Sequence, residues 1–167
     1  RLSLNEFKNI VLISFNKSKL VLLTLIFTLA FVQLIIYSNL NTSNLNGIPQ
    51  IIALQFSNLG FFYLFVSPFI GAFGSYIAGS ATVSNLIFSS LQESVAINNS
   101  LSSSLVLALQ LAGASAGNMI AIHNIIAVLA LVSLNGMESK IMKINLLIVF
   151  IYCFVLGLLA YLMYLFF

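Results

Sequence analysis

Two clusters of small polar residues interrupt an otherwise apolar chain, and they are its best candidates for binding chemistry. The first cluster, Gly79 to Asn85, reads GSATVSN and lies within residues 20–92, which contain no Asp, Glu, Lys, Arg or His. The second, Gly113 to Asn118, reads GASAGN. Hydroxyl and amide groups can hydrogen-bond a small anion, and a helix that begins at such a break adds free N–H groups and a positive dipole end.

We expect both clusters to lie at membrane depth, and polar breaks at that depth indicate a substrate site. Backbone buried in lipid must be hydrogen-bonded internally, so such breaks persist only where protein or a wet cavity encloses them. Many secondary transporters build their substrate site from paired breaks of this kind. The alternative is packing: a kink with internally bonded hydroxyls in the first cluster, and a G-x-x-x-G helix face in the second. We expect one shared binding site from six residues: Ser80, Thr82, Ser84, Asn85, Gly117 and Asn118.

The second cluster also matches the G-x-S-x-G pattern of serine hydrolases around Ser115. That motif requires a strand-to-helix turn, whereas the surrounding sequence is helical in character. His123 lies about 12 Å from Ser115 along a continuous helix, too far for a hydrogen bond. The chain has no Asp, and its three acids, Glu6, Glu93 and Glu138, lie near expected segment ends. We therefore expect no catalytic residues and no enzymatic activity.

His123 and Glu93 are candidates for proton coupling. An ionisable residue within a membrane segment is a functional candidate by default. The alternatives are a histidine hydrogen-bonded to a neighbouring helix and a glutamate that faces water. The chain has no metal-ligand spacing, phosphate loop or Cys pair, since Cys153 is its single cysteine, so we expect neither metal nor cofactor.

The composition predicts an all-α integral membrane protein. The chain is 61% hydrophobic and 5% charged, whereas soluble domains carry about 25% charged residues. A spanning helix needs about 20 apolar residues, so the 167 residues have room for about four to six passes. The net charge of +3 comes from cations at segment ends and does not indicate nucleic-acid binding.

Hydropathy and turn residues divide the chain into five segments with broken helices. The expected segments are a cytoplasmic or interfacial stretch (1–19), a transmembrane helix (20–37), a kinked hairpin or helix pair with a polar break at 79–85 (48–97), a broken transmembrane helix with its break at 113–118 (101–134), and a C-terminal transmembrane helix (144–167). Thr82 or Ser84 is expected to cap the short helix that follows the first break.

Positive residues set the expected orientation. Lys17 and Lys19 precede the first span, and Lys140 and Lys143 precede the last, so both spans should run from inside to outside and place the C-terminus outside. An odd number of crossings must then separate them. Either 48–97 is a re-entrant hairpin, which we favour because the polar cluster lies at its turn, or it crosses the membrane twice.

The polar clusters and their flanks resemble the bacterial L-lactate permease family. The family pattern G-S-x-T-x-S-N-x-x-F-x-x-L-Q is matched by eight residues: Gly79, Ser80, Thr82, Ser84, Asn85, Phe88, Leu91 and Gln92. Gly117, Asn118, Met119 and Ile120 match its G-N-M-I element, and the resemblance is strong over about residues 67–140. Many members have an acid where this chain has Ala81, so any coupling role of that acid must fall to another group here.

The resemblance implies secondary transport of L-lactate, or glycolate, with protons across the bacterial inner membrane. It implies that this chain is one half of an inverted-repeat fold, and that membrane lipid and an N-terminal remainder of the transporter are its partners. Arg1 in place of Met agrees with that expectation. The rival interpretations are a transporter of another small anion, such as a dicarboxylate, and a non-transporting membrane subunit.

Overall fold

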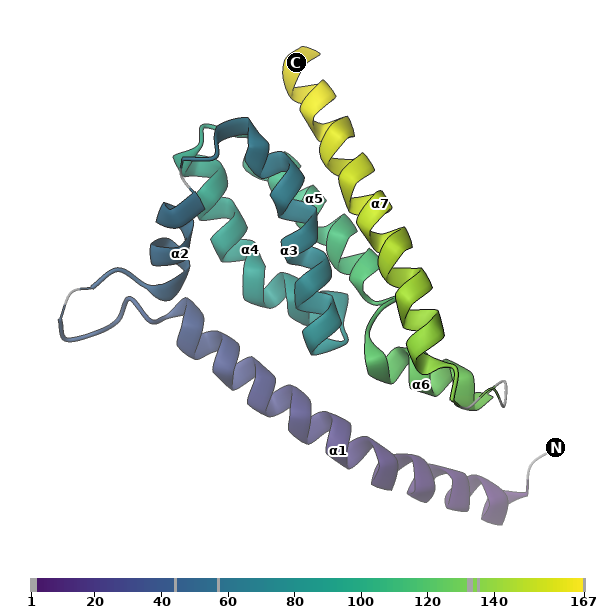
Figure 1. Cartoon of the computed structure of the whole chain (residues 1–167). Coiled ribbons are helices and arrows are strands. Elements are labelled where there is room, and N and C mark those ends of the chain that lie inside the picture. The colour runs from purple at the N-terminus through teal and green to yellow at the C-terminus, as the bar shows by residue number, and fades with distance from the viewer. Residues whose placement is uncertain (1–2, 44, 57, 132–133, 135, 167) are drawn as a thin grey trace. The chain divides into compact units, whose positions relative to one another are not determined.

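The computed structural model describes residues 3–43, 45–56, 58–131, 134 and 136–166, and within them every regular element is a helix. The elements are α1 (Leu4–Ile36), α2 (Ile48–Phe56), the 3-10 turn η1 (Gly60–Phe62), α3 (Tyr63–Ala78), α4 (Ala81–Asn98), α5 (Ser103–Gly117), α6 (Ile122–Leu131) and α7 (Glu138–Phe166), as Figure 1 shows. They form two compact units, residues 1–34 and 35–167. The predicted all-α class is confirmed.

Helix α1 is continuous from Leu4 to Ile36, where the sequence predicted an interfacial segment and a separate span. A capping box starts it: the Ser3 amide donates to the Glu6 carboxylate at 2.8 Å, and the Glu6 amide donates to the Ser3 hydroxyl at 3.3 Å. No Gly or Pro then occurs before its end, so nothing in the sequence stops the helix. The side chains of Lys17 and Lys19 are not among those that the structure describes.

Helices α3 and α4 form an antiparallel hairpin with a shorter break than predicted. Only Gly79 and Ser80 separate the two helices, so the polar residues from Thr82 to Asn85 lie within the first turns of α4. Gly79 ends α3 in the left-handed conformation at φ 66°, which glycine adopts without strain, and its amide donates to the Ser75 carbonyl at 2.7 Å.

The second break also lies further along the chain than predicted. Helix α5 continues through Gly113 to Gly117, and the chain bends between Asn118 and Ala121 before α6 begins. Neither Gly113 nor Gly117 has a positive φ. Because glycine can pack inside a membrane helix, these two residues bring helices together and do not unwind the chain.

Small residues let α3 and α5 pack in parallel at very close range. A side chain on Gly113 would collide with the Pro68 carbonyl, one on Gly117 with the Ala72 carbonyl, and one on Gly71 with the Gln110 carbonyl. Helix α7 contacts α3 through a seam of its own, whose buried members are Val149, Cys153, Gly157 and Ala160. The G-x-x-x-G pattern therefore acts as a packing face in this fold.

Two described helical stretches are long and apolar enough to cross a membrane, Gly60–Ala78 and Glu138–Phe166. The pair Ser103–Gly117 and Ile122–Leu129, which bends by 40°, makes a third if it is one broken span. The chain is therefore an all-α membrane protein. Whether residues 48–97 form a re-entrant hairpin or cross the membrane twice stays a prediction, as does the orientation of the C-terminus.

We expect Gly113→Val to destabilise the α3–α5 contact, because the new side chain would overlap the Pro68 carbonyl. Overpacking of this kind costs about 1–3 kcal/mol. Thermal melting of the detergent-solubilised protein should show a lower midpoint than in Ala108→Val, a matched change at an exposed position of the same helix. Equal melting of the two variants would contradict the packing.

Candidate functional site

Ser80 holds the first break by capping α4. Its hydroxyl accepts a hydrogen bond from the Val83 amide at 3.4 Å, and its carbonyl accepts one from the Ser84 amide at 3.0 Å. Capping by Ser80 replaces the predicted capping by Thr82 or Ser84. An extended serine directly before the first helical residue is the usual N-cap geometry.

The outer face of α4 lines an open groove of about 470 Å³. The groove contains three residues predicted for function, Thr82, Asn85 and Glu93. Its other lining residues are Leu86, Ser89, Ser90 and Leu107. Hydroxyl, amide and carboxyl groups therefore share one face of this helix, and the side chains of Thr82 and Glu93 are exposed on it.

Ser84 points the other way, into the protein. It is fully buried, and its hydroxyl donates to the Gly71 carbonyl at 2.8 Å and accepts from the Gln110 amide at 3.2 Å. The Ser84 hydroxyl proton is therefore already engaged in a hydrogen bond and cannot be donated to a substrate. Ser84 therefore holds α4 against α3 and α5. This agrees with the alternative in which the hydroxyls of the first cluster are bonded internally and serve helix packing.

A buried amide network connects the core to Asn85. The Tyr63 hydroxyl donates to the Gln92 carbonyl oxygen at 2.7 Å, and the Gln92 amide donates to the Gln110 carbonyl oxygen at 2.8 Å. The Gln110 amide in turn donates to Asn85 Oδ1 at 3.3 Å. Sequence reasoning missed Gln110 as a site residue, although a glutamine inside the apolar run LVLALQLA was a usable signal.

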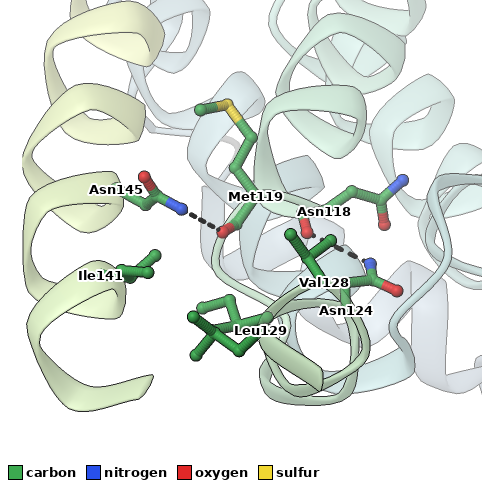
Figure 2. Close-up of a pocket in the computed structure, with 8 residues that line it drawn as sticks. Asn118, Met119, Asn124, Val128, Leu129, Ile141 and Asn145 are labelled. Carbon is green, nitrogen blue, oxygen red and sulfur yellow. Dashed lines mark hydrogen bonds between the residues drawn. The ribbon is translucent and has the colours of Figure 1, made fainter. Parts of the chain in front are cut away.

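Asparagine side chains hold the second break (Figure 2). Asn124 Nδ2 donates to the Asn118 carbonyl at 3.2 Å, and Asn145 Nδ2, from α7, donates to the Met119 carbonyl at 2.7 Å. Both carbonyls lie between helices, where no helical N–H reaches them. No local pattern predicts the partner of Asn145, because that partner lies 26 residues away in the sequence.

A second cavity of about 210 Å³ lies beside this break. Its lining residues are Asn118, Met119, Asn124, Ile125, Val128, Leu129, Ile141 and Asn145. Asn118 Oδ1 is buried and has no hydrogen-bond partner in the described part of the chain. Gly117 is buried against α3 and does not line this cavity.

The two cavities have no lining residue in common, so the structure does not bring Asn85 and Asn118 into one pocket. His123 links the two breaks: its Nε2 lies 3.2 Å from the Gly79 carbonyl, which can only accept a hydrogen bond. The Ser115 hydroxyl donates to the Leu111 carbonyl at 2.9 Å. Among the described residues, no hydrogen bond joins Ser115 to His123, as a serine nucleophile and its base would require.

The comparison with known protein families decides the family. The family model described as L-lactate permease matches residues 1–167, the whole chain. The chain belongs to the L-lactate permease family. The resemblance inferred from the polar clusters is thereby confirmed.

Relatives within the family are much longer than this chain. It is 35% identical to a "Putative L-lactate permease" of Haemophilus influenzae over 153 residues, which are 91% of the chain and 28% of that relative. Over 101 residues, 60% of the chain and 18% of each relative, it is 35% identical to the L-lactate permease of Escherichia coli K12 and 33% identical to the Glycolate permease GlcA of the same strain. The matched stretch is therefore 28% of the length of the first relative and 18% of the length of the other two. No solved structure matches.

We expect Asn145→Leu to loosen the second break, because the Met119 carbonyl would lose its donor. A hydrogen bond at an exposed position such as this one contributes about 0.5–1.5 kcal/mol. Hydrogen exchange followed by mass spectrometry should show faster exchange of the amides around residues 119–125. The matched variant Asn98→Leu, at an exposed position near the end of α4, should leave that exchange unchanged. Equal exchange in both variants would contradict the role of Asn145.

Proposed function

We propose that the complete protein of which this chain is a part is a secondary transporter of L-lactate, or of the closely similar glycolate. The observation that carries the proposal is the match of the L-lactate permease model to the whole chain, together with relatives named for these two hydroxy-acids. The helical architecture and apolar composition agree with transport across the bacterial plasma membrane. A family of permeases indicates a transporter and not an enzyme.

The groove on α4 is the part of this chain best suited to the substrate. Thr82 and Asn85 lie in the first turns of α4, close to the free N–H groups and positive dipole end of that helix. The part of the groove lining that the structure describes contains no Lys or Arg, so the anion would be held by hydrogen bonds and the helix dipole. Binding without a full ion pair suits a carrier that must release its substrate.

The remaining candidate residues take supporting parts in this proposal. Ser80 and Ser84 fix the start of α4, and Gly117 brings α5 against α3. Asn118 keeps an unpaired buried oxygen at the second break, where it is a second candidate for substrate contact.

Proton coupling is assigned to Glu93, with His123 as the alternative. Glu93 lines the same groove as Asn85 and lies eight residues, about 12 Å, further along the helix. A proton carried on Glu93 would neutralise the charge of the transported lactate, so the anion and a proton would enter together.

The rest of the transporter is proposed to complete the site. The family relatives are several times longer than this chain, and an inverted-repeat carrier works by moving one repeat against another. We place the C-terminus outside the cell, because Lys140 and Lys143 begin α7. A reporter that is active only when exported, fused to the C-terminus, tests this orientation. An inactive reporter would show that the C-terminus lies inside the cell.

We expect Asn85→Ala, made in the complete protein, to weaken labelled L-lactate uptake about ten- to a hundredfold at normal membrane levels. This is the effect of losing a hydrogen bond to a charged group, about 1.5–3 kcal/mol. Ser94→Ala is the matched control, because Ser94 lies on α4 outside the groove and bonds only the Ser90 carbonyl. Wild-type uptake by Asn85→Ala would remove the groove from the substrate path.

Asn118→Ala tests the second break in the same assay. Because the two cavities have no lining residue in common, the losses caused by Asn85→Ala and Asn118→Ala should be additive in the double variant. A double variant that loses clearly less than the sum would show that both residues touch one substrate. Competition by a dicarboxylate stronger than by unlabelled lactate would instead favour the rival substrate class.

A further inference from the structure

We infer that Gln110, which lies behind the groove on α5, is a positioning residue that makes the groove selective for anions. It holds Asn85 so that the amide nitrogen of Asn85, and not its oxygen, faces the groove. This inference rests on the proposed function, and it adds to that function the residue that sets the charge preference of the site.

The direction of the buried network is fixed first by the Ser67 carbonyl. Gln92 is fully buried, and its Nε2 donates to this backbone oxygen at 3.1 Å. A backbone carbonyl can only accept, so the Gln92 amide cannot be turned round without setting oxygen against oxygen. The second Nε2 hydrogen of Gln92 then meets the side chain of Gln110, whose oxygen must face it.

The Gly71 carbonyl fixes the same direction independently. It accepts the single proton of the Ser84 hydroxyl, so Ser84 can only accept from its other neighbour, Gln110. Gln110 must therefore present its NH2 group to Ser84. Two backbone oxygens on α3 thus set the orientation of one side-chain amide on α5, which is 1% exposed.

Gln110 passes this orientation on to Asn85. One Nε2 hydrogen goes to Ser84, and the other goes to Asn85 Oδ1 at 3.3 Å. If Asn85 turned round, its NH2 group would meet the NH2 group of Gln110, and the buried Gln110 donor would lose its acceptor. The Asn85 oxygen is therefore held inward. Its Nδ2 has no hydrogen-bond partner among the described residues and is left for the groove.

Asn85 is the only amide side chain among the described residues that line the groove. An outward NH2 group donates to a carboxylate, whereas an outward oxygen would repel it. None of the described residues that line the groove is a lysine or an arginine, so the orientation of this amide decides whether it offers a carboxylate an N–H donor or an oxygen. Gln110 controls that orientation without touching the substrate.

The test compares Gln110→Glu and Gln110→Met in the complete protein, with Ser115→Ala as control on the same helix. An ionised carboxylate at this position can only accept, so it would take a hydrogen bond from the Asn85 NH2 group and turn the Asn85 oxygen outward. Burial favours the protonated carboxyl, which would still donate to Asn85, so Gln110→Glu and the wild type are compared at the highest pH at which the wild type transports. Methionine, of similar length, removes the constraint and leaves Asn85 free to adopt either orientation. Uptake of labelled L-lactate gives KM and Vmax, and competition by unlabelled L-lactamide, the neutral amide of the same acid, reports charge preference.

We expect the KM of Gln110→Glu for lactate to rise about ten- to a hundredfold, as for the loss of a hydrogen bond to a charged group. Lactamide should compete better against lactate in this variant than in the wild type. In Gln110→Met the KM should rise about two- to tenfold with little change in Vmax, because affinity falls with the fraction of Asn85 in the competent orientation. Ser115→Ala should match the wild type.

A folded Gln110→Glu with the wild-type ratio of lactate to lactamide affinity would overturn the inference. If Gln110→Glu does not reach the membrane, Gln110→Met is the deciding variant. An unchanged KM for lactate in Gln110→Met would also overturn the inference. A wild-type protein that takes up neither lactate nor glycolate would overturn the proposed function itself, and that result is separate from any difference between the variants.

Discussion

The paired side-chain amides of Gln92 and Gln110 are the interaction on which the rest of the helical core depends. Both glutamines are almost completely buried, and an amide without partners in so apolar a protein costs several kcal/mol. Their other partners come from two helices, since Tyr63 and the Ser67 carbonyl belong to α3, and Ser84 belongs to α4. Because Gln110 itself belongs to α5, the network joins three helices. Satisfying every group at once leaves one register for α3, α4 and α5, which is how a buried polar network specifies a unique arrangement.

Close helix contact is the condition for these hydrogen bonds. Gly71 and Gly113 bring the backbones of α3 and α5 together, so that a glutamine on one helix reaches partners on the others. The two breaks then differ in how their free backbone groups are satisfied. A serine cap starts α4 at the first break, whereas asparagine side chains from α6 and α7 support the second. The first break leaves a helix N-terminus beside the open groove, and the second has its exposed carbonyls already bonded.

Much of this arrangement could be read from the sequence, because local chemistry determines it. The all-α class, the turn at Gly79 and the family followed from composition and from residue types at fixed spacing. The extent of the two breaks did not follow from these signals. Ser80 can cap a helix that begins at Ala81, so the later polar residues of that cluster became helical.

The direction of each polar side chain also needed the tertiary structure. Ser84 and Asn85 are adjacent in sequence, yet Ser84 is fully buried and Asn85 reaches the groove. Consecutive residues of a helix point about 100° apart, so only the position of α3 and α5 decides which one is inside. The pairing of Asn145 with Met119 and the network through Gln110 depend on contacts between distant segments, which a single sequence does not contain.

A double-mutant cycle between Asn85 and Gln110 tests the central claim, that the buried network acts on the substrate only by orienting Asn85. The quantity to measure is the KM for L-lactate of the wild type, Asn85→Ala, Gln110→Met and the variant carrying both changes. Residues coupled in this way are strongly non-additive. Gln110→Met should therefore raise the KM when Asn85 is present and have no further effect once Asn85 is alanine. The same increase in both backgrounds would contradict the account.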